Sequence, residues 1–504
     1  MVANNNLVQS KKAHMKIVFL QKDSFVKIAV MILSAMLKKH GHECEVIIES
    51  GERNFMKAVL ESNADMFAFS CTTGSEKWAL DRASELKALC RVPIIMGGPH
   101  PTFFPEVIQE PSIDFICRGE GEHAIIDIAN ALQQDPDSLY HIPNIWCKDK
   151  DGNIIKNDVR NFIADLDETP WPDFTPYSRY SYLIPYNRDM YPVMTGRGCP
   201  YNCSYCFNKN YKKLYSGKGR YVRKRSPEHV IGELTHAMNT IGIQKINFVD
   251  DSFFCNPSWL RRFAPLYMEK IRLPFIINLE ATQVTDELMK LVKDMGCICV
   301  RMGVETGNEH LRRTILNKKI SNEQIKKAAS IIKKYGISLS TFNILGLPGE
   351  TIDQALETYS INLDINSDFL QCSLLQPYPG TDLRTYVEEH HLLEESTEPV
   401  LEESFFVATQ LKIENKKEIV NLQKLMPVMA QFRIKPDTVR RLIRLPHNFI
   451  FDILFKTTFV TKKIRTQKLK LFPLIRLGLH SLSYMRPQRK GQMPGRAASA
   501  TSST

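Results

Sequence analysis

TGRGCPYNCSYCFNKN, residues 195–210, contains Cys199, Cys203 and Cys206 in a C-x3-C-x2-C spacing. Thiolate sulfur is the usual ligand of iron–sulfur clusters, and three cysteines on a cube of four irons leave one iron open to a further ligand. A structural zinc site normally has four protein ligands, and no fourth Cys or His follows here at zinc-finger spacing. The spacing therefore favours an open iron–sulfur cluster over a partial zinc site. Tyr205 is expected to lie against a flat ligand beside that cluster.

Before this stretch, residues 15–140 alternate between short strand-like runs and helical patterns. This alternation predicts a doubly wound parallel sheet, whose ligands bind beyond the carboxyl ends of the strands. The expected strands cover residues 16–20, 44–48, 66–70, 93–96 and 114–117.

Small and polar residues gather at the expected strand ends of this first sheet. Glycine lets the backbone approach a large ligand, and hydroxyl groups can bond to its amides. A strand that ends in glycine is more often only a tight turn, so both interpretations stay open on the pattern alone. The residues are Ser70, Thr72, Thr73, Gly97, Gly98, His100, Gly119 and Glu120.

A second alternating region follows the cysteines and reaches about residue 385, with expected strands at 193–195, 245–249, 275–279, 298–302, 338–344 and 369–375. Six strand–helix units suit a partial barrel, in which polar residues at the strand ends face the active site. Asp250 and Asp251 follow the second of these strands, where a carboxylate would either accept from a cationic ligand or cap a helix. Glu305, Gly346 and Gly349 follow later strands.

The CxxxCxΦC motif after a short strand resembles the signature of radical S-adenosylmethionine (SAM) enzymes. GGPHPTFFPE, RGEGEHAI, MGVETGNE, ILGLPGET and QPYPGTDL resemble the subfamily that carries an N-terminal cobalamin-binding domain. The resemblance covers residues 15–385. It implies an α/β fold with a flavodoxin-like, doubly wound cobalamin-binding sheet at 15–140, a linker at 141–190, and a partial (βα)6 TIM-like radical SAM barrel at 191–385.

The resemblance also implies the cofactors and their contacts. A 4Fe–4S cluster on the three cysteines would chelate the amino and carboxylate groups of SAM, whose reductive cleavage gives a 5′-deoxyadenosyl radical. Tyr205, Asp250, Asp251, Glu305, Gly346 and Gly349 would contact SAM, and residues 70–74, 97–100 and 119–122 would cradle cobalamin. An external electron donor such as a flavodoxin or ferredoxin is implied as a partner.

Two positions depart from the family pattern. The D-x-H-x-x-G motif, which supplies a histidine to the lower face of cobalt in many cobalamin proteins, is absent, and Asp23-Ser24-Phe25-Val26 follows the first strand instead. We therefore expect no histidine ligand from this loop, and His100 is expected to contact the edge of the corrin or nothing. Gln283 stands where relatives commonly carry an arginine that points toward SAM.

The composition is that of a globular protein: 504 residues, 43% hydrophobic and 24% charged. No uncharged apolar run reaches 18 residues, and no apolar segment of a secretory signal follows the N-terminus. The 12 cysteines are dispersed, which suits a reducing compartment rather than a disulfide framework. A cytoplasmic protein is expected, either free or peripheral on the inner face of the membrane.

Residues 386–490 read as an acidic linker followed by a basic helical region, and residues 491–504 as a disordered tail. Residues 431–490 hold 15 Lys or Arg against Asp437 and Asp452, so this segment accounts for the net charge of +11. Three interpretations stay open for it: a helical cap over the barrel mouth, a membrane-surface segment, and an RNA-binding tail. The cap is the favoured one and nucleic acid the least favoured.

The resemblance implies methylation or another modification of an unactivated carbon in a lipid-like, tetrapyrrole or natural-product substrate. An oxidative cyclase of the anaerobic tetrapyrrole type is a close alternative within the subfamily. A methylthiotransferase would need a second cysteine-ligated cluster, whereas the other cysteines are scattered. A cobalamin-binding sensor with a relic barrel is the non-enzymatic alternative, and the intact cysteine motif weighs against it.

Overall fold

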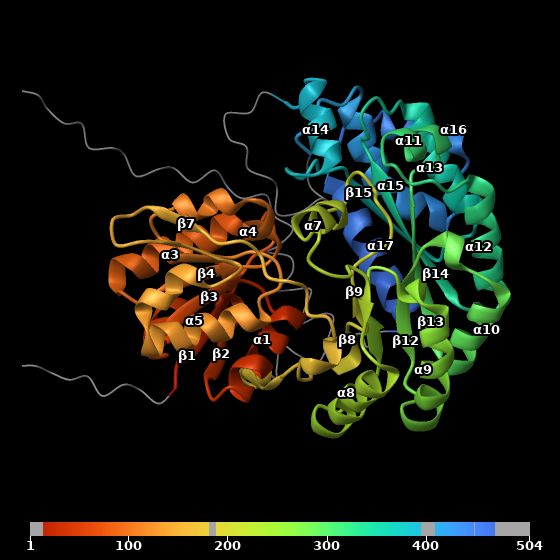
Figure 1. Ribbon diagram of the computed structural model, residues 1–504. Coiled ribbons are helices and arrows are strands. Elements are labelled where there is room, and N and C mark those ends of the chain that lie inside the picture. The colour runs from red at the N-terminus through yellow and green to blue at the C-terminus, as the bar shows by residue number, and fades with distance from the viewer. Residues whose placement is uncertain (1–13, 181–187, 395–408, 448, 469–504) are drawn as a thin grey trace, which may run out of the picture.

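The computed structural model describes residues 14–180, 188–394, 409–447 and 449–468. Two α/β domains lie side by side, and a group of helices from the C-terminal part of the chain packs on the second domain (Figure 1). The predicted fold class is thereby confirmed. The basic and polar residues from 469 onward, including the predicted tail at 491–504, lie outside the described residues, as does most of the acidic segment.

The first domain contains a sheet that has seven strands in the described part of the chain, in the order β2-β1-β3-β4-β5-β6-β7. The first five are parallel, and their 2-1-3-4-5 order is that of flavodoxin-like folds, with the change of direction between β1 and β3. Their bounds are β1 (Lys16–Gln21), β2 (Glu43–Ile48), β3 (Met66–Ser70), β4 (Ile94–Gly97), β5 (Phe115–Cys117), β6 (Ile145–Lys148) and β7 (Ile154–Lys156).

Helices cover both faces of this sheet because side chains of successive strand residues point to opposite sides. Ile17 and Phe19 of β1 pack toward α1 and α5, while Val18 and Leu20 pack toward α2 and α3. The helices are α1 (Ile28–Lys39), α2 (Phe55–Leu60), α3 (Glu76–Leu89), α4 (Pro99–Phe103) and α5 (Glu122–Gln134).

The expected linker at 141–190 differs from the structure in its first part. β6 and β7 form an antiparallel hairpin on the edge of β5, so the sheet continues to Lys156. Tyr177 and Tyr180, from the 3-10 turn Thr175–Tyr180, are buried in the core of the first domain. The pattern concealed this because the strands are short and the segment is rich in proline and aspartate. Residues 181–187 lie outside the description.

The second domain is a parallel sheet with six strands among the described residues, in the order β15-β14-β13-β12-β11-β8. Each expected strand of the barrel is present within a few residues of its expected bounds. The strands are β8 (Tyr191–Val193), β11 (Ile246–Phe248), β12 (Phe275–Leu279), β13 (Cys297–Glu305), β14 (Ser338–Leu345) and β15 (Phe369–Leu374). A short antiparallel ribbon of β9 (Gly196–Arg197) and β10 (Arg223–Lys224) lies beside the first strand.

Helices on the outside of this sheet enclose the main hydrophobic core of the barrel. They begin at well-defined caps; for example, Ser321 and Gln324 form a capping box at the start of α12. The helices of this domain are α7 (Asn208–Leu214), α8 (Pro227–Thr240), α9 (Pro257–Lys270), α10 (Asp286–Met295), α11 (Glu309–Thr314), α12 (Asn322–Lys334), α13 (Ile352–Asp364) and α14 (Asp382–Glu389).

The C-terminal helices are α15 (Lys416–Gln431), α16 (Pro436–Ile443) and α17 (Phe449–Gln467). These described helices pack on the barrel but do not cover its mouth, whereas residues 469–490 of the segment expected to form the cap lie outside the described residues. α15 packs with α13 against β15. Ile464 of α17 packs with Met190 and Ile276, and Lys245 donates to the carbonyls of Gln467 and Lys468 at the amino ends of the strands. α17 therefore lies at the end opposite the mouth.

Candidate active site

The three cysteines of the C-x3-C-x2-C motif lie on the loop between β9 and α7. Each is half-buried, and none of them forms a disulfide. The loop is fixed from both sides, because the amide of Ser204 donates to the carbonyl of Leu316 at 3.1 Å and the amide of Leu383 donates to the carbonyl of Ser204 at 3.0 Å. Asn208 donates through Nδ2 to Cys206 Sγ at 3.4 Å.

The geometry of this loop suits a cluster better than a single metal ion. Within the described ranges, no three His, Cys, Asp or Glu side chains surround one point closely enough to hold an ion. A cube of four irons needs a wider arrangement, because each thiolate binds a different iron. Burial raises the pKa of Cys203 to about 11 and also raises that of Cys206, so both thiols must lose their protons when iron binds.

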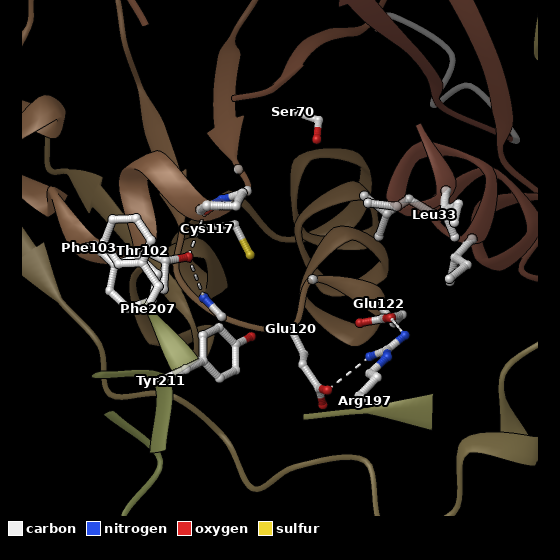
Figure 2. A pocket seen from close by; sticks show the side chains of 18 of the residues that line it. Leu33, Ser70, Thr102, Phe103, Cys117, Glu120, Glu122, Arg197, Phe207 and Tyr211 are labelled. Carbon is white, nitrogen blue, oxygen red and sulfur yellow. Dashed lines mark hydrogen bonds and ion pairs between the residues drawn. The ribbon is translucent and has the colours of Figure 1, made fainter. Parts of the chain in front are cut away.

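A cavity of about 670 Å³ lies between the two domains, next to the cysteine loop. Its floor is formed by strand ends of the first domain, and Ser70 and Cys117 point into it (Figure 2). Phe207 and Tyr211, which follow the last cysteine, lie on the other side. The cavity therefore joins the two predicted cofactor sites, as expected for ligands held at the carboxyl ends of parallel strands.

Glycine is required on the floor of this cavity. Gly98 and Gly119 both have positive φ, +96° and +80°, a region that residues with a side chain rarely adopt. A Cβ atom on Gly98 would lie 2.8 Å from the carbonyl oxygen of Cys71, and one on Gly119 would overlap the hydroxyl of Tyr215. Thr102 ties the two glycine turns together, accepting from the amide of Gly119 at 3.0 Å and donating to the carbonyl of Gly98 at 2.7 Å (Figure 2).

Four charged side chains, of which Glu120, Glu122 and Arg223 are buried and Arg197 is 18% exposed, form one wall of the cavity. Glu120 accepts from Arg223 at 2.7 Å. Glu120 also accepts from Arg197 at 2.9 Å, and Arg197 donates to Glu122 (Figure 2). Burial alone would raise the pKa of Glu120, but the hydrogen bond from Arg223 and the charges of both arginines hold it below its usual value. Because the glutamates belong to the first domain and the arginines to the β9–β10 ribbon, this network ties the two domains together beside the cysteine loop.

Aromatic side chains form the wall nearest the cysteines. Phe103 stacks on Phe207 with ring centroids 4.4 Å apart (Figure 2), and Phe207 contacts Tyr378. Tyr211 and Tyr221 also line the cavity. Sequence reasoning missed these residues together with Arg197 and Arg223. They come from separate elements, and the pattern of each element gives no sign that its aromatic or basic residue meets the others.

A second cavity, of about 210 Å³, opens on the other side of Phe69 and Ser70, which line both cavities. It lies at the β1–β3 switch point. Lys27, which lines it, donates to the carbonyl of Ser70 at 2.7 Å, and hydroxyl groups of Thr72 and Ser75 stand nearby. Cations and hydroxyl groups suit the phosphate-bearing nucleotide tail of cobalamin.

The predicted cobalamin contacts divide into two groups. Ser70, Gly97, Gly98, Gly119 and Glu120 line the large cavity, and Thr72 lines the second. Thr73 and His100 line neither of these two cavities. Instead, His100 Nδ1 lies 3.3 Å from Thr73 Oγ1, and the imidazole ring stacks on Phe104. Burial lowers the pKa of His100 to about 4.

Replacing His100 with alanine is expected to leave the electron paramagnetic resonance spectrum of bound cob(II)alamin unchanged. No histidine among the described residues lines the large cavity, so the lower face of cobalt would carry no imidazole nitrogen. The measurement is the nitrogen splitting of the cobalt signal. A splitting in the wild-type spectrum that disappears in His100→Ala would show that His100 is the ligand after all.

Asp250 and Asp251 have separate tasks, although they are neighbours. Asp250 is buried and accepts from the amide and hydroxyl of Thr195 at 3.1 and 2.6 Å and from Lys224 at 3.0 Å, so it fixes the turn before the cysteines. Asp250 caps no helix of the described residues and does not line the large cavity. Asp251 lines the large cavity, and burial raises the pKa of its carboxyl group. Asn208 donates to Asp251 at 3.3 Å.

Glu305 ends β13 in the left-handed region, with φ +65°, at a register shift against β14. Such an irregularity redirects a side chain, and here it brings the carboxylate to Lys318. Lys318 is buried and donates to Glu305 at 3.0 Å and lies 3.0 Å from Glu280. Gln283 bonds to Ser252 and to the amide of Glu280, so it caps a turn. Two buried cations stand at this rim of the barrel: Lys318, which pairs with both glutamates, and Arg312, which donates to the carbonyls of Val304 and Thr306.

Gly346 and Gly349 both have positive φ, +77° and +72°, in the loop after β14. The amide of Gly346 donates to Glu350 at 2.6 Å, and the amide of Leu347 donates to the same carboxyl oxygen at 3.3 Å. The expected backbone contact with adenine therefore cannot use the amide of Gly346 while Glu350 holds it. Burial raises the pKa of Glu350 to about 8.

The variant Glu350→Gln is expected to lose less stability than the wild type when the pH rises from about 6 to about 8. The folded protein keeps the proton of Glu350 up to about pH 8, whereas the unfolded chain releases it near pH 4.3, so unfolding releases a proton and wild-type stability falls across this window. The loss approaches ~1.4 kcal/mol per pH unit. Denaturant unfolding at both pH values measures it, with the exposed Glu323→Gln as the control. An equal loss of stability in the wild type, Glu350→Gln and Glu323→Gln would contradict the raised pKa of Glu350.

Comparison with known proteins agrees with the architecture. Residues 22–129 match the B12 binding domain, and residues 193–361 match the Radical SAM superfamily. The chain is similar to an uncharacterized methyltransferase of Pyrococcus horikoshii, with 27% identity over 83% of this chain and 90% of the relative. It is also similar to the anaerobic magnesium-protoporphyrin IX monomethyl ester cyclase of Rubrivivax gelatinosus, with 28% identity over 57% of this chain and 52% of the relative, so it spans about half of that protein.

Among solved structures, the radical SAM methyltransferase TsrM from Kitasatospora setae, with cobalamin and a [4Fe-4S] cluster bound, has a similar fold. The TM-score is 0.64 at 16% identity, covering 80% of this chain and 81% of that one. The residues of this chain fit the same groups: three cysteines for a cluster, and a glycine floor, a charged wall and two adjoining cavities for cobalamin.

Proposed function

This chain is a radical SAM enzyme with an N-terminal B12-binding domain, and from that premise we propose that it transfers a methyl group to an unactivated carbon of an apolar small molecule. The observation that carries the proposal is the single cavity that reaches from the glycine floor of the first domain to Cys206 and Asp251 in the second. A substrate carbon in that cavity would lie within reach of both cofactors.

When bound, the cluster with SAM supplies a radical that removes hydrogen, and cobalamin supplies a methyl group. The residues of the chain hold and separate these groups. Gly98 and Gly119 let the backbone approach the corrin. The bond between Arg197 and Glu120 holds the glycine floor of the cavity in a fixed position relative to the cysteine loop. Tyr205 and Asp251, which lie on the barrel side of the cavity, are the proposed contacts to SAM.

Glu305, with Lys318 and Glu280 beside it, is proposed to bind the methionyl or ribose part of SAM. These three side chains carry a net charge of −1 and lie at the strand ends on the barrel side of the site. SAM carries a net positive charge, so the cluster of side chains matches it electrostatically. The loop of Gly346 and Gly349 remains the proposed adenine side, through its carbonyl groups and the side chain of Leu347.

The substrate is proposed to be apolar and flat, of lipid-like, tetrapyrrole or natural-product type. The lining is mostly apolar and includes aromatic rings and aliphatic side chains of α1, and four of its charged groups, Glu120, Glu122, Arg197 and Arg223, pair with one another. Pockets of this kind bind apolar ligands and orient them through a few polar groups. The relative from Rubrivivax gelatinosus acts on a magnesium protoporphyrin ester, by its name, which supports this class.

Oxidative cyclisation is the second candidate, and the same relative favours it. A methylthiotransferase is less well supported, because it would need a second cysteine-ligated cluster, whereas the other described cysteines are scattered through the two domains. Most cysteines outside the motif are buried one by one in the cores of the two domains, as Cys71, Cys297 and Cys372 show.

The products distinguish the two candidates. After anaerobic reconstitution with both cofactors, methylation predicts that S-adenosylhomocysteine and 5′-deoxyadenosine form together, whereas 5′-deoxyadenosine alone would reject methylation and favour the cyclase. Mass analysis of lipid and tetrapyrrole extracts from expressing and non-expressing cells identifies the substrate. Protein that carries the cluster but never cleaves SAM under strong reductant would contradict both candidates and favour a sensor.

We further propose that the enzyme works in the reducing cytoplasm and takes single electrons from a flavodoxin or ferredoxin. The half-buried cysteine loop supports this, because a reduced low-potential cluster survives only in such an environment. In the described part of the chain, no helix is both long and apolar enough to span a bilayer. Any contact that these residues make with a membrane would therefore be at its surface.

A further inference from the structure

α17 has an apolar side that nothing in the described structure covers. Phe451 and Phe455 are buried against the barrel and α15, but Phe449, Ile450 and Ile453 are 71%, 51% and 54% exposed. Leu454 and Val460 extend the same side of the helix. A helix on the surface of a globular protein normally exposes polar residues and buries its apolar side. The first two turns of α17 instead place apolar side chains both against the barrel and outward.

Two apolar side chains outside α17 are exposed as well. Phe432, which follows the last residue of α15, is 67% exposed, and Leu445, in the turn after α16, is 47% exposed. We use the name α17 face for the exposed apolar residues of α17 itself, which are Phe449, Ile450, Ile453, Leu454 and Val460.

Positive charge accompanies the α17 face. Arg441 and Arg444 are exposed on α16 and the turn after it, and Arg465 and Lys468 are exposed at the end of α17. The acidic side chain nearest the start of α17, Asp452, is paired with Lys424 at 2.6 Å. An exposed apolar face bordered by unopposed basic residues matches an anionic lipid interface, where apolar side chains enter the acyl boundary and cations meet the headgroups.

We propose that the α17 face docks the enzyme on the surface of an anionic phospholipid bilayer, without spanning it. The proposal rests on the proposed function in one respect. The proposed substrate is apolar and would dissolve in a bilayer, so docking there would bring the enzyme to its substrate. RNA would satisfy the arginines but leave Phe449, Ile450 and Ile453 in water. The chain after residue 468 is an alternative occupant of the face, and the experiment separates it from lipid.

The experiment is flotation of the full-length, cluster-loaded protein with vesicles of phosphatidylcholine alone or with about 30% phosphatidylglycerol. The wild type is expected to float with the anionic vesicles, and less in high salt. Ile450→Glu/Ile453→Glu is expected to reduce binding at least roughly tenfold, because it places two charges in the apolar layer. Leu60→Glu/Leu89→Glu, on exposed leucines of the first domain, is the matched control and should bind like the wild type.

Arg441→Gln/Arg444→Gln keeps the apolar face and is expected to lose part of its binding to anionic vesicles. This second variant still tests the proposal if Ile450→Glu/Ile453→Glu is unstable. Three outcomes would overturn the proposal: wild type that does not float, binding that is equal with neutral vesicles, and binding that survives both pairs of substitutions. Wild type that stays in solution, together with a large drop in thermal stability of Ile450→Glu/Ile453→Glu, would identify the chain's own residues as the occupant. Cleavage of SAM by the same preparations tests the proposed function separately.

Discussion

Cys203→Ala should contain almost no iron after anaerobic reconstitution, whereas the wild type should hold about four atoms per chain. The cysteine loop supplies three thiolates, and two sulfurs cannot retain the cube. Cleavage of SAM should fall at least roughly a thousandfold, because the open iron is lost with the cluster. Iron analysis and the visible charge-transfer absorption measure the first effect, and formation of 5′-deoxyadenosine measures the second.

Cys297→Ala is the matched control, since Cys297 is fully buried in the barrel core and far along the chain from the motif. It should keep its iron and lose only packing energy. Iron near eight atoms per wild-type chain would indicate a second cluster and revive the methylthiotransferase alternative. Iron that persists at about four in Cys203→Ala would show that the three cysteines are not the ligands.

Gly119→Ala is expected to weaken the retention of cobalamin at least roughly a hundredfold. The new Cβ atom would overlap the Tyr215 hydroxyl, to which the amide of Glu120 donates at 2.8 Å. Tyr215 also stacks on Phe162, with ring centroids 3.9 Å apart, so it cannot move without opening the junction of the two domains. The cavity floor and the bonds of Glu120 would therefore be displaced together. Cobalamin titration by absorbance measures the loss.

Gly152→Ala separates this effect from backbone strain. Gly152 also has a positive φ, +84°, but a Cβ atom there meets nothing within 4 Å. It should cost roughly 1 to 2 kcal/mol of folding stability for the left-handed backbone and leave cobalamin binding unchanged. If both variants bound cobalamin like the wild type, the glycine floor would not be the cobalamin site.

The order of strands and helices could be predicted from the sequence because it depends on local periodicity. β3 and β12 begin and end at their expected residues. The cysteine motif could be predicted for a similar reason, since its spacing is contained in eight residues. Local patterns also placed Gly98 and Gly119 at strand ends, where the structure shows that a side chain would collide with its surroundings.

What could not be predicted depends on contacts between distant segments. Asp250 and Asp251 are indistinguishable in sequence, yet Lys224 and Thr195 engage the first while the second faces the cavity. The β6–β7 hairpin was missed because strands of four and three residues carry almost no periodicity. The position of α17 under the barrel follows from apolar contacts with Met190 and Ile276, which its own sequence does not reveal.

The ion pairs of Glu120 bear on attempts to build hybrid enzymes. Glu120 and Glu122 come from one module, and Arg197 and Arg223 from the other, and Arg223 is buried against Glu120. Grafting a foreign cobalamin module that lacks the counterpart of Glu120 would leave the guanidinium of Arg223 buried without a carboxylate partner. A chimaera must therefore exchange the loop of Glu120 and Glu122 together with the β9–β10 ribbon. The point at which two enzymes can be joined thus lies after this ribbon and not at the boundary between the domains.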